Sequence, residues 1–254
     1  MITAGVAHLD EGAGDPLVLL MGLGAPAGAW APHSRVWSRN YRCISVDNRG
    51  AGGTPLGGEP ATTQLMAGDV ARLIDALGIG SCSVVGISMG ACIAQELALA
   101  RPDLVRKVVL VAPWARCDYS TASLLEVMLR VRRSGDSRAF NELLRNTIWT
   151  PDWINQHSVE MAVDLELEPE VSINAFEQQV LACQEHDSFD RLTGILAPTL
   201  VTFGSDDIFI RPSLSLEVAS AIPSAETTIF QNCGHVHHWE DLDRFNSLVE
   251  EWLK

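Results

Sequence analysis

The 254-residue sequence has no long hydrophobic run and little positive charge. No stretch approaches the roughly 18 consecutive apolar residues that a membrane span requires, and no basic segment with an apolar stretch behind it follows Met1. Only 18 Lys and Arg stand against 32 Asp and Glu, and the net charge of -14 would repel nucleic-acid phosphates. We therefore expect a cytoplasmic protein that binds neither a membrane nor a nucleic acid.

Paired cysteines are also missing. The chain has six cysteines, but no two of them form a C-x-x-C pair. This spacing signals neither a zinc site nor a disulfide framework, so we expect reduced, mostly buried thiols and no bound metal.

The sequence does have apolar segments that alternate with amphipathic ones. Strands are predicted over residues 2–9, 17–21, 41–46, 81–85, 105–111, 198–203 and 226–230. Helices are predicted over residues 62–77, 91–100, 213–221 and 241–253. This alternation indicates one α/β domain, with a mostly parallel sheet covered by helices on both faces.

The alternation stops between residues 115 and 192. This part has helical stretches at 123–133, 137–145 and 171–185 but no convincing strand. It predicts a helical lid, residues 115–192, inserted into a core made of residues 1–114 and 193–254 and shaping a pocket. The arginines of the first stretch, Arg130, Arg132 and Arg133, are interpreted as a solvated helix face, with the binding of an acidic substrate as the alternative.

Gly86-Ile87-Ser88-Met89-Gly90 lies where a buried strand meets a helix. A serine on such a tight turn takes strained backbone angles, and the glycines avoid clashes with the neighbouring strand and helix. The pattern is typical of a nucleophile elbow, with Ser88 at the positive end of the following helix.

A serine hydroxyl needs a base, and the base needs a group that orients it. Asp206 and Asp207 follow the strand at 198–203, and His235 follows the strand at 226–230. Because the carboxyl ends of parallel strands meet at one edge of a sheet, we expect Ser88, one of the aspartates and His235 to converge there.

The tetrahedral intermediate of acyl transfer needs hydrogen-bond donors where negative charge develops. The backbone N–H groups of Met89 and of Leu23, in the Gly22-Leu23-Gly24 loop after the strand at 17–21, are the candidates.

Aromatic residues near the predicted lid are candidate pocket residues. Trp114, just beyond the strand at 105–111, and Trp149 and Trp153 within the lid are expected to line an apolar pocket, with core packing as the alternative. His237 and His238 compete with His235 by sequence, but we expect them to line the entrance or contact the last helix.

Together, Ser88, Asp207, His235, the Gly22-Leu23-Gly24 loop and Asp47-Asn48-Arg49-Gly50 resemble the α/β-hydrolase fold family over nearly the whole chain. The chain is similar to small bacterial members such as 3-oxoadipate enol-lactone hydrolases, aminoacrylate or carbamate hydrolases, and carboxylesterases. The resemblance implies an eight-stranded, mostly parallel sheet and cofactor-free acyl transfer, and it favours Asp207 over Asp206. Met21 replaces the histidine that many relatives carry before the oxyanion glycine, so the support of that loop must differ.

These observations predict a serine hydrolase for a small to medium ester or lactone, active as a monomer or homodimer. The alternatives are a carbon-carbon bond hydrolase, an amide or carbamate hydrolase, a haloperoxidase-like activity, and a ligand-binding protein on a hydrolase scaffold. The substrate is expected to be neutral or modestly apolar unless a local arginine such as Arg116 favours an anion. Glu240 is expected to cap the last helix.

Overall fold

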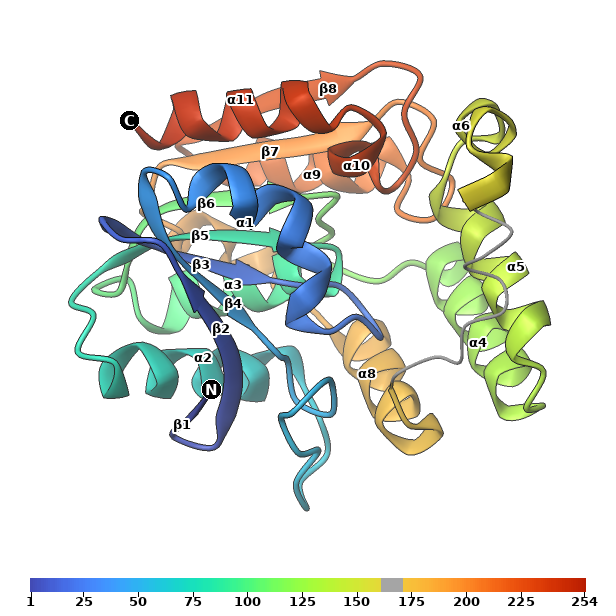
Figure 1. Ribbon diagram of the computed structural model, residues 1–254, viewed down its shortest axis with the longest axis horizontal. Coiled ribbons are helices and arrows are strands. Elements are labelled where there is room, and N and C mark those ends of the chain that lie inside the picture. The colour runs from blue at the N-terminus through green and yellow to red at the C-terminus, as the bar shows by residue number, and fades with distance from the viewer. Residues whose placement is uncertain (161–170) are drawn as a thin grey trace.

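A computed structural model describes residues 1–160 and 171–254. Its eight-stranded sheet has the order β1-β2-β4-β3-β5-β6-β7-β8 (Figure 1). The strands are β1 (Ile2–Thr3), β2 (Val6–Glu11), β3 (Asp15–Leu20), β4 (Tyr41–Val46), β5 (Cys82–Ile87), β6 (Val105–Val111), β7 (Thr199–Gly204) and β8 (Ala225–Phe230). The β1–β2 and β2–β4 pairs are antiparallel and the other pairs are parallel, which confirms the predicted fold class.

The prediction of one strand over residues 2–9 was wrong. The chain reverses at Ala4 and Gly5, whose φ angles are 50° and 81°, and β1 pairs back onto β2. Two successive left-handed residues make a tight hairpin turn, and only the glycine of the pair takes that conformation without strain.

Side chains of the parallel strands alternate between two hydrophobic cores. Val18 and Leu20 of β3 belong to one core, whereas Leu17 and Leu19 belong to the other. The first core is covered by α2 (Thr63–Ala76), α3 (Met89–Ala100) and α9 (Pro212–Ala221), and the second by α1 (Ala31–Trp37) and α11 (Leu242–Leu253). Both faces of the sheet are therefore buried, as its continuous apolar strands require.

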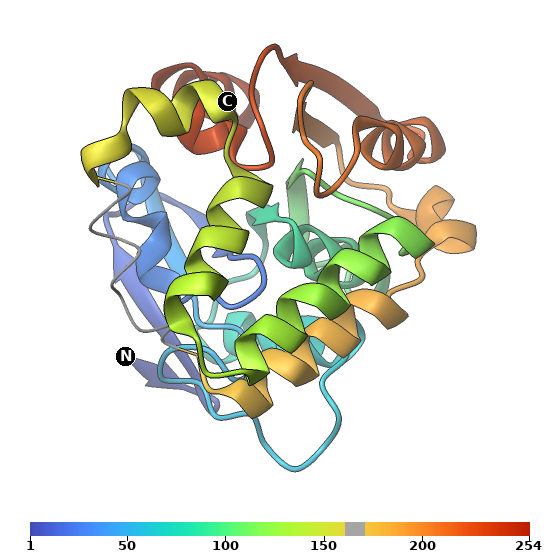
Figure 2. The ribbon, with the colours of Figure 1, turned by 90° about the vertical axis from the view of Figure 1, so that its right-hand side faces the viewer.

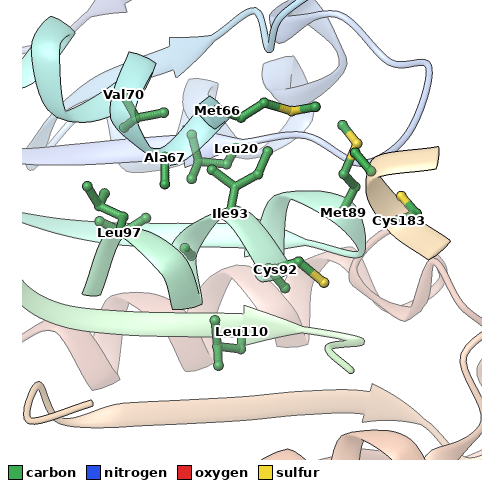
Figure 3. Close-up of a cluster of buried hydrophobic side chains, with 14 of the residues drawn as sticks. Leu20, Met66, Ala67, Val70, Met89, Cys92, Ile93, Leu97, Leu110 and Cys183 are labelled. Atoms are coloured by element: carbon green, nitrogen blue, oxygen red, sulfur yellow. The ribbon is translucent and has the colours of Figure 1, made fainter. Parts of the chain in front are cut away.

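The first core fixes the position of α3, the helix that follows Ser88. Figure 3 shows the sheet residue Leu20 near Ile93 and Leu97 of α3 and near the α2 side chains Met66, Ala67 and Val70. All six side chains are at most 2% exposed. This packing holds the start of α3 at the carboxyl edge of the sheet.

A helical segment lies between β6 and β7, and we call its described residues, 115–160 and 171–192, the lid. Its helices are α4 (Tyr119–Arg133), α5 (Ser137–Ile148), α6 (Pro151–Gln156) and α8 (Ile173–Glu185). Figure 2 shows α4 and α8 side by side, and Figure 1 places α4, α5 and α6 on the side toward which β8 points. An isolated antiparallel bridge between Arg116 and Asp187 joins the two ends of the segment.

Capping residues explain where the lid helices begin. The Asp118 side chain accepts a hydrogen bond from the N–H of Thr121, and α4 therefore begins four residues earlier than its apolar pattern predicts. Ser172 caps α8 in the same way through the N–H of Ala175. Within the described residues, periodicity also missed the short α-helices α1, α6 and α10 (His237–Glu240). None of the helices within 1–160 and 171–254 combines the length and the apolar character that a bilayer span needs.

Candidate active site

Ser88 occupies the turn between β5 and α3. Its backbone angles are φ 55° and ψ -121°, and its N–H donates to the carbonyl oxygen of Val111 at 2.8 Å. This conformation is strained for a residue with a β-carbon, and such strain persists only when the surroundings impose it. The residue is 5% exposed and lies at the positive end of α3.

The two flanking glycines make this turn possible. A β-carbon on Gly86 would overlap the carbonyl group of Gly90, and one on Gly90 would overlap the carbonyl oxygens of Leu20 and Met21. Because backbone atoms of the sheet and helix cannot move aside, only glycine fits at either position. The local sequence therefore dictates the turn.

His235 and Asp207 form a buried pair. The Nδ1 atom of His235 lies 2.8 Å from Oδ2 of Asp207, and both residues are less than 5% exposed. Oδ1 of the same carboxylate accepts from the N–H groups of Phe209 and Ile210, each at 2.9 Å. With the Nδ1 proton shared with the carboxylate, Nε2 is the nitrogen free to take a proton.

The geometry distinguishes the two candidate aspartates. Asp206 is exposed and accepts from its neighbour Ser205 at 2.7 Å, whereas Asp207 contacts the imidazole of His235. The strand–turn pattern alone left this choice open.

Ser88 and His235 line one cavity of about 200 Å³ beneath the lid. Gly22 and Leu23 line it as well, and a β-carbon on Gly22 would lie 3.3 Å from Cβ of Ser88. The lid supplies an apolar roof through Met128, Phe140, Leu144, Ile148, Val171 and Phe176. The site is therefore a small, largely apolar chamber with a hydroxyl and an imidazole in its wall.

The loop at Gly22 is held by side-chain amides. Asn48 donates from Nδ2 to the carbonyl oxygen of Met21 at 2.8 Å. Gln179 of α8 accepts from the N–H of Gly24 at 2.9 Å and donates to the carbonyl oxygen of Arg49 at 2.9 Å. These contacts support the loop in the absence of the histidine that Met21 replaces. The sequence did not predict the role of Gln179.

The backbone of Met89 is the other candidate donor. Its side chain is fully buried in the first core, and Figure 3 shows it directed toward the lid helix that carries Cys183. The Met89 side chain does not line the cavity, so the role of its backbone N–H group as a donor stays a prediction.

Comparison with known proteins fits this geometry. Residues 15–242 match the family model described as alpha/beta hydrolase fold. The chain belongs to the α/β-hydrolase fold family. It is 33% identical to "Putative non-heme bromoperoxidase BpoC" of Mycobacterium tuberculosis, over 96% of this chain and 95% of that protein.

Two further relatives carry other names. The chain is 30% identical to "Putative carbamate hydrolase RutD" of Azorhizobium caulinodans, over 94% of this chain and 91% of that protein. It also resembles the solved structure of a thermophilic esterase from Thermogutta terrifontis, bound to malate, with 26% identity, a TM-score of 0.87, and coverage of 98% of this chain and 92% of that one.

The tryptophan predictions need correction in this α/β-hydrolase. Trp114 is 1% exposed and lies in the first core, where its ring meets His186 edge-on at 6.3 Å rather than lining the cavity. Trp149 and Trp153 stack on each other at 3.9 Å outside the cavity wall, and Trp149 stacks on Trp239, which does line it. Apolar character predicted burial, but it did not indicate on which side of the chain each ring lies.

His237 and His238 are core residues and not entrance residues. Both rings contact Phe245 of α11, as the sequence predicted. Nε2 of His237 lies 3.0 Å from Oγ1 of Thr202, and burial lowers the pKa of His237 to about 3. His238 also lines the cavity, and burial holds its pKa well below the usual value.

The three arginines of α4 do not share one environment. Arg130 and Arg133 are exposed and form ion pairs with Glu126 at 2.9 Å and Glu177 at 2.6 Å. Arg132 is buried and lines the cavity, so its assignment to a solvated face was wrong. The sequence pattern could have indicated this burial, because Arg132 follows the buried Leu125, Met128 and Leu129 at helical spacing.

Arg116 and Glu240 also differ from expectation. Arg116 is exposed and pairs with Asp187 at 2.8 Å, away from the cavity. Glu240 does not cap α11, because it ends the short helix α10. Its carboxylate accepts from the N–H of Thr150 at 2.6 Å and from that of Gly234 at 2.5 Å, and it thereby joins the lid to the histidine loop.

Proposed function

We propose that this α/β-hydrolase is a cofactor-independent serine hydrolase of small to medium carboxylic esters or lactones. The observation that carries the proposal is the buried Asp207–His235 hydrogen bond beside an apolar cavity that His235 shares with the strained Ser88. Each member of the group supplies one requirement of acyl transfer: nucleophile, base and orienting acid.

In the proposed reaction, Oγ of Ser88 attacks the substrate carbonyl carbon while Nε2 of His235 takes the hydroxyl proton. Asp207 keeps the imidazole in the required tautomer and stabilises its positive charge. The N–H groups of Leu23 and Met89 donate to the developing oxyanion. His235 then protonates the leaving alcohol, and an activated water molecule releases the acid from the serine ester.

The cavity supports a small substrate. Its volume of about 200 Å³ is below the roughly 300 Å³ at which most drug-sized ligand sites begin. The similarity to a solved esterase supports ester cleavage, and the similarity to a relative named as a carbamate hydrolase makes carbamates the alternative substrate class. Turnover of matched aryl esters, lactones and carbamates, with product analysis, separates these classes.

The nucleophile is tested with a fluorophosphonate probe and peptide mass analysis. We expect the probe to label Ser88 in the native protein, and we expect labelling to disappear when His235 is replaced by Gln. Ser88→Ala should fold normally and lose activity by about 10⁴-fold or more, because the three residues act as a unit.

Ser83→Ala is the matched control. Ser83 is a fully buried serine on β5, the strand that leads to Ser88. Its hydroxyl has no hydrogen-bond partner among the described residues. This variant should keep both labelling and turnover. A folded native protein that resists the probe and hydrolyses no ester would instead support the ligand-binding alternative.

A further inference from the structure

Arg132 lies on the last turn of α4 with its side chain in the candidate active-site cavity. It is 9% exposed, and it is the only permanently charged residue among the described residues that line this cavity. Its neighbours in the wall are apolar. A cation in such surroundings has lost most of its hydration and gains little from the wall in return.

The described residues satisfy this guanidinium only in part. Nη2 donates to the carbonyl oxygen of Val171 at 3.1 Å, and Cζ lies 5.8 Å from the centre of the Phe140 ring. Nε is buried and has no hydrogen-bond partner in the part of the chain that the structure describes. No carboxylate within residues 1–160 and 171–254 forms an ion pair with Arg132, in contrast to Arg130 and Arg133.

Two phenylalanine rings of the roof connect the loop at Gly24 with Arg132. A β-carbon on Gly24 would lie 3.2 Å from the Phe176 ring, and the Phe176 and Phe140 rings meet edge-on at 5.3 Å. The guanidinium of Arg132 in turn lies over the Phe140 ring. Ser88 and Arg132 line the same cavity, and the roof residues that line it with them, among them Phe140 and Phe176, are apolar.

We propose that Arg132 binds a carboxylate at the distal end of the acyl group, so that the preferred substrates are monoesters or lactones of dicarboxylic acids. This inference rests on the proposed serine hydrolase function and names its substrate class. A carboxylate supplies the counter-ion and the acceptor for Nε that the described residues do not provide, and the planar guanidinium favours such a group over a point-like anion. The phenylalanine rings pack against the methylene groups between the two ends.

The net charge of -14 does not oppose this assignment. Exposed charges are screened over a Debye length of about 8 Å at physiological ionic strength, whereas a buried cation acts on a bound anion with little screening. The local guanidinium therefore decides the charge preference of the cavity. This replaces the expectation of a neutral substrate, and the responsible arginine is Arg132 instead of Arg116.

The first test compares shape-matched 4-nitrophenyl esters. Monoesters of succinate, glutarate and adipate are paired with neutral esters in which an isopropyl group replaces the terminal carboxylate. We expect the native enzyme to favour at least one charged ester in kcat/KM, with the best chain length reporting the distance from Ser88 to Arg132. In Arg132→Met the kcat/KM for that ester should fall by about 30-fold or more, mainly through KM, while the neutral partner changes little.

Two variants separate recognition from packing. Arg132→Lys keeps a cation and should recover part of the preference, and Arg130→Met removes an exposed arginine from the same helix and should leave it unchanged. Equal losses on charged and neutral esters in Arg132→Met, without recovery in Arg132→Lys, would assign Arg132 a purely structural role. A native preference for the neutral esters would also overturn the proposal.

A binding experiment makes the result independent of turnover. Ser88→Ala is titrated calorimetrically with glutarate and with glutaramide, with and without Arg132→Met. Arg132-dependent binding of glutarate but not of glutaramide, together with no ester hydrolysis by the native protein, would refute the proposed function and keep the anion site. Ester hydrolysis through Ser88 with no effect of Arg132 on turnover or on glutarate binding would refute only the anion site.

Discussion

His33, His186 and His237 are buried as neutral side chains, and this makes the fold sensitive to mild acid. Removal from water lowers the pKa of His33 and of His186 to about 4 and that of His237 to about 3. His33 and His237 each contact the ring of Phe245 in α11, and His186 lies in the other core beside Thr63, with its Nδ1 3.7 Å from Oε1 of Glu96. Burial opposes the protonation of all three in the native state.

The magnitude follows from proton linkage. Below pH 6.5 the unfolded chain binds a proton at each histidine, whereas the native state excludes it until the pH approaches 4 or 3. The unfolded state thus holds more protons in this window, and the free energy of unfolding falls as the pH falls. From pH 7 to pH 5 each histidine costs about 2 kcal/mol, so the three together cost about 6 kcal/mol.

A loss of this size is comparable to the whole stability of many domains, which is about 5–15 kcal/mol. Arginine partners lower the pKa of Asp10 and Asp187 below the ordinary value of 3.8, and the stability from these groups is lost only as the pH falls below that value. The histidines therefore reduce stability between pH 6.5 and 4, whereas these two carboxylates do so only at lower pH.

Urea denaturation at pH 7, 6, 5.5 and 5, followed by tryptophan fluorescence, measures this loss. His237→Gln should lower the free energy of unfolding at pH 7 but reduce its dependence on pH by about 1 kcal/mol per pH unit between pH 7 and pH 5. Phe245→Leu, which weakens the same packing without removing a titratable group, should lower stability at every pH and leave the slope unchanged. Equal free energies of unfolding at pH 7 and pH 5 in the native protein would refute the linkage argument.

Two further substitutions test the support of the candidate site. Asp207→Asn should lower kcat by about 10⁴-fold at neutral pH, because an amide does not hold the required tautomer of the imidazole, while Asp206→Asn, at the exposed neighbour, should change kcat less than threefold. A larger loss of kcat in Asp206→Asn than in Asp207→Asn would identify Asp206 as the orienting acid. Glu240→Gln leaves one oxygen for two N–H donors and should destabilise the fold by about 1–3 kcal/mol, with faster amide exchange at Thr150 and Gly234. Unchanged exchange at both amides would show that Glu240 does not join the lid to the histidine loop.

The sequence predicted those parts of the site that depend on local geometry. Gly86, Ser88 and Gly90 identify the turn because backbone clashes exclude other residues at the two glycine positions. His235 follows a strand whose partners in the sheet bring it to the same edge as Ser88, so strand order was enough to predict their proximity. The predicted starts of the lid helices were less accurate, because the capping residues lie before the apolar pattern begins.

Long-range contacts decided the rest. Neither the choice of Asp207 over Asp206 nor the role of Gln179 is visible in the local pattern, since each depends on a partner far along the chain. Glu240 has a carboxylate that suits a helix cap, but the short helix α10 directs it to Thr150 and Gly234 instead.

The amino-acid sequence by itself determined the order of strands and helices, the strained serine turn and the edge of the sheet where the site lies. These features follow from residue spacing and from steric limits within a few residues. Only the tertiary structure decided that Trp114 is a core residue and that Arg132 lies in the cavity. Helical spacing shows which side chains share a face, but the environment of that face depends on which distant segments pack against it.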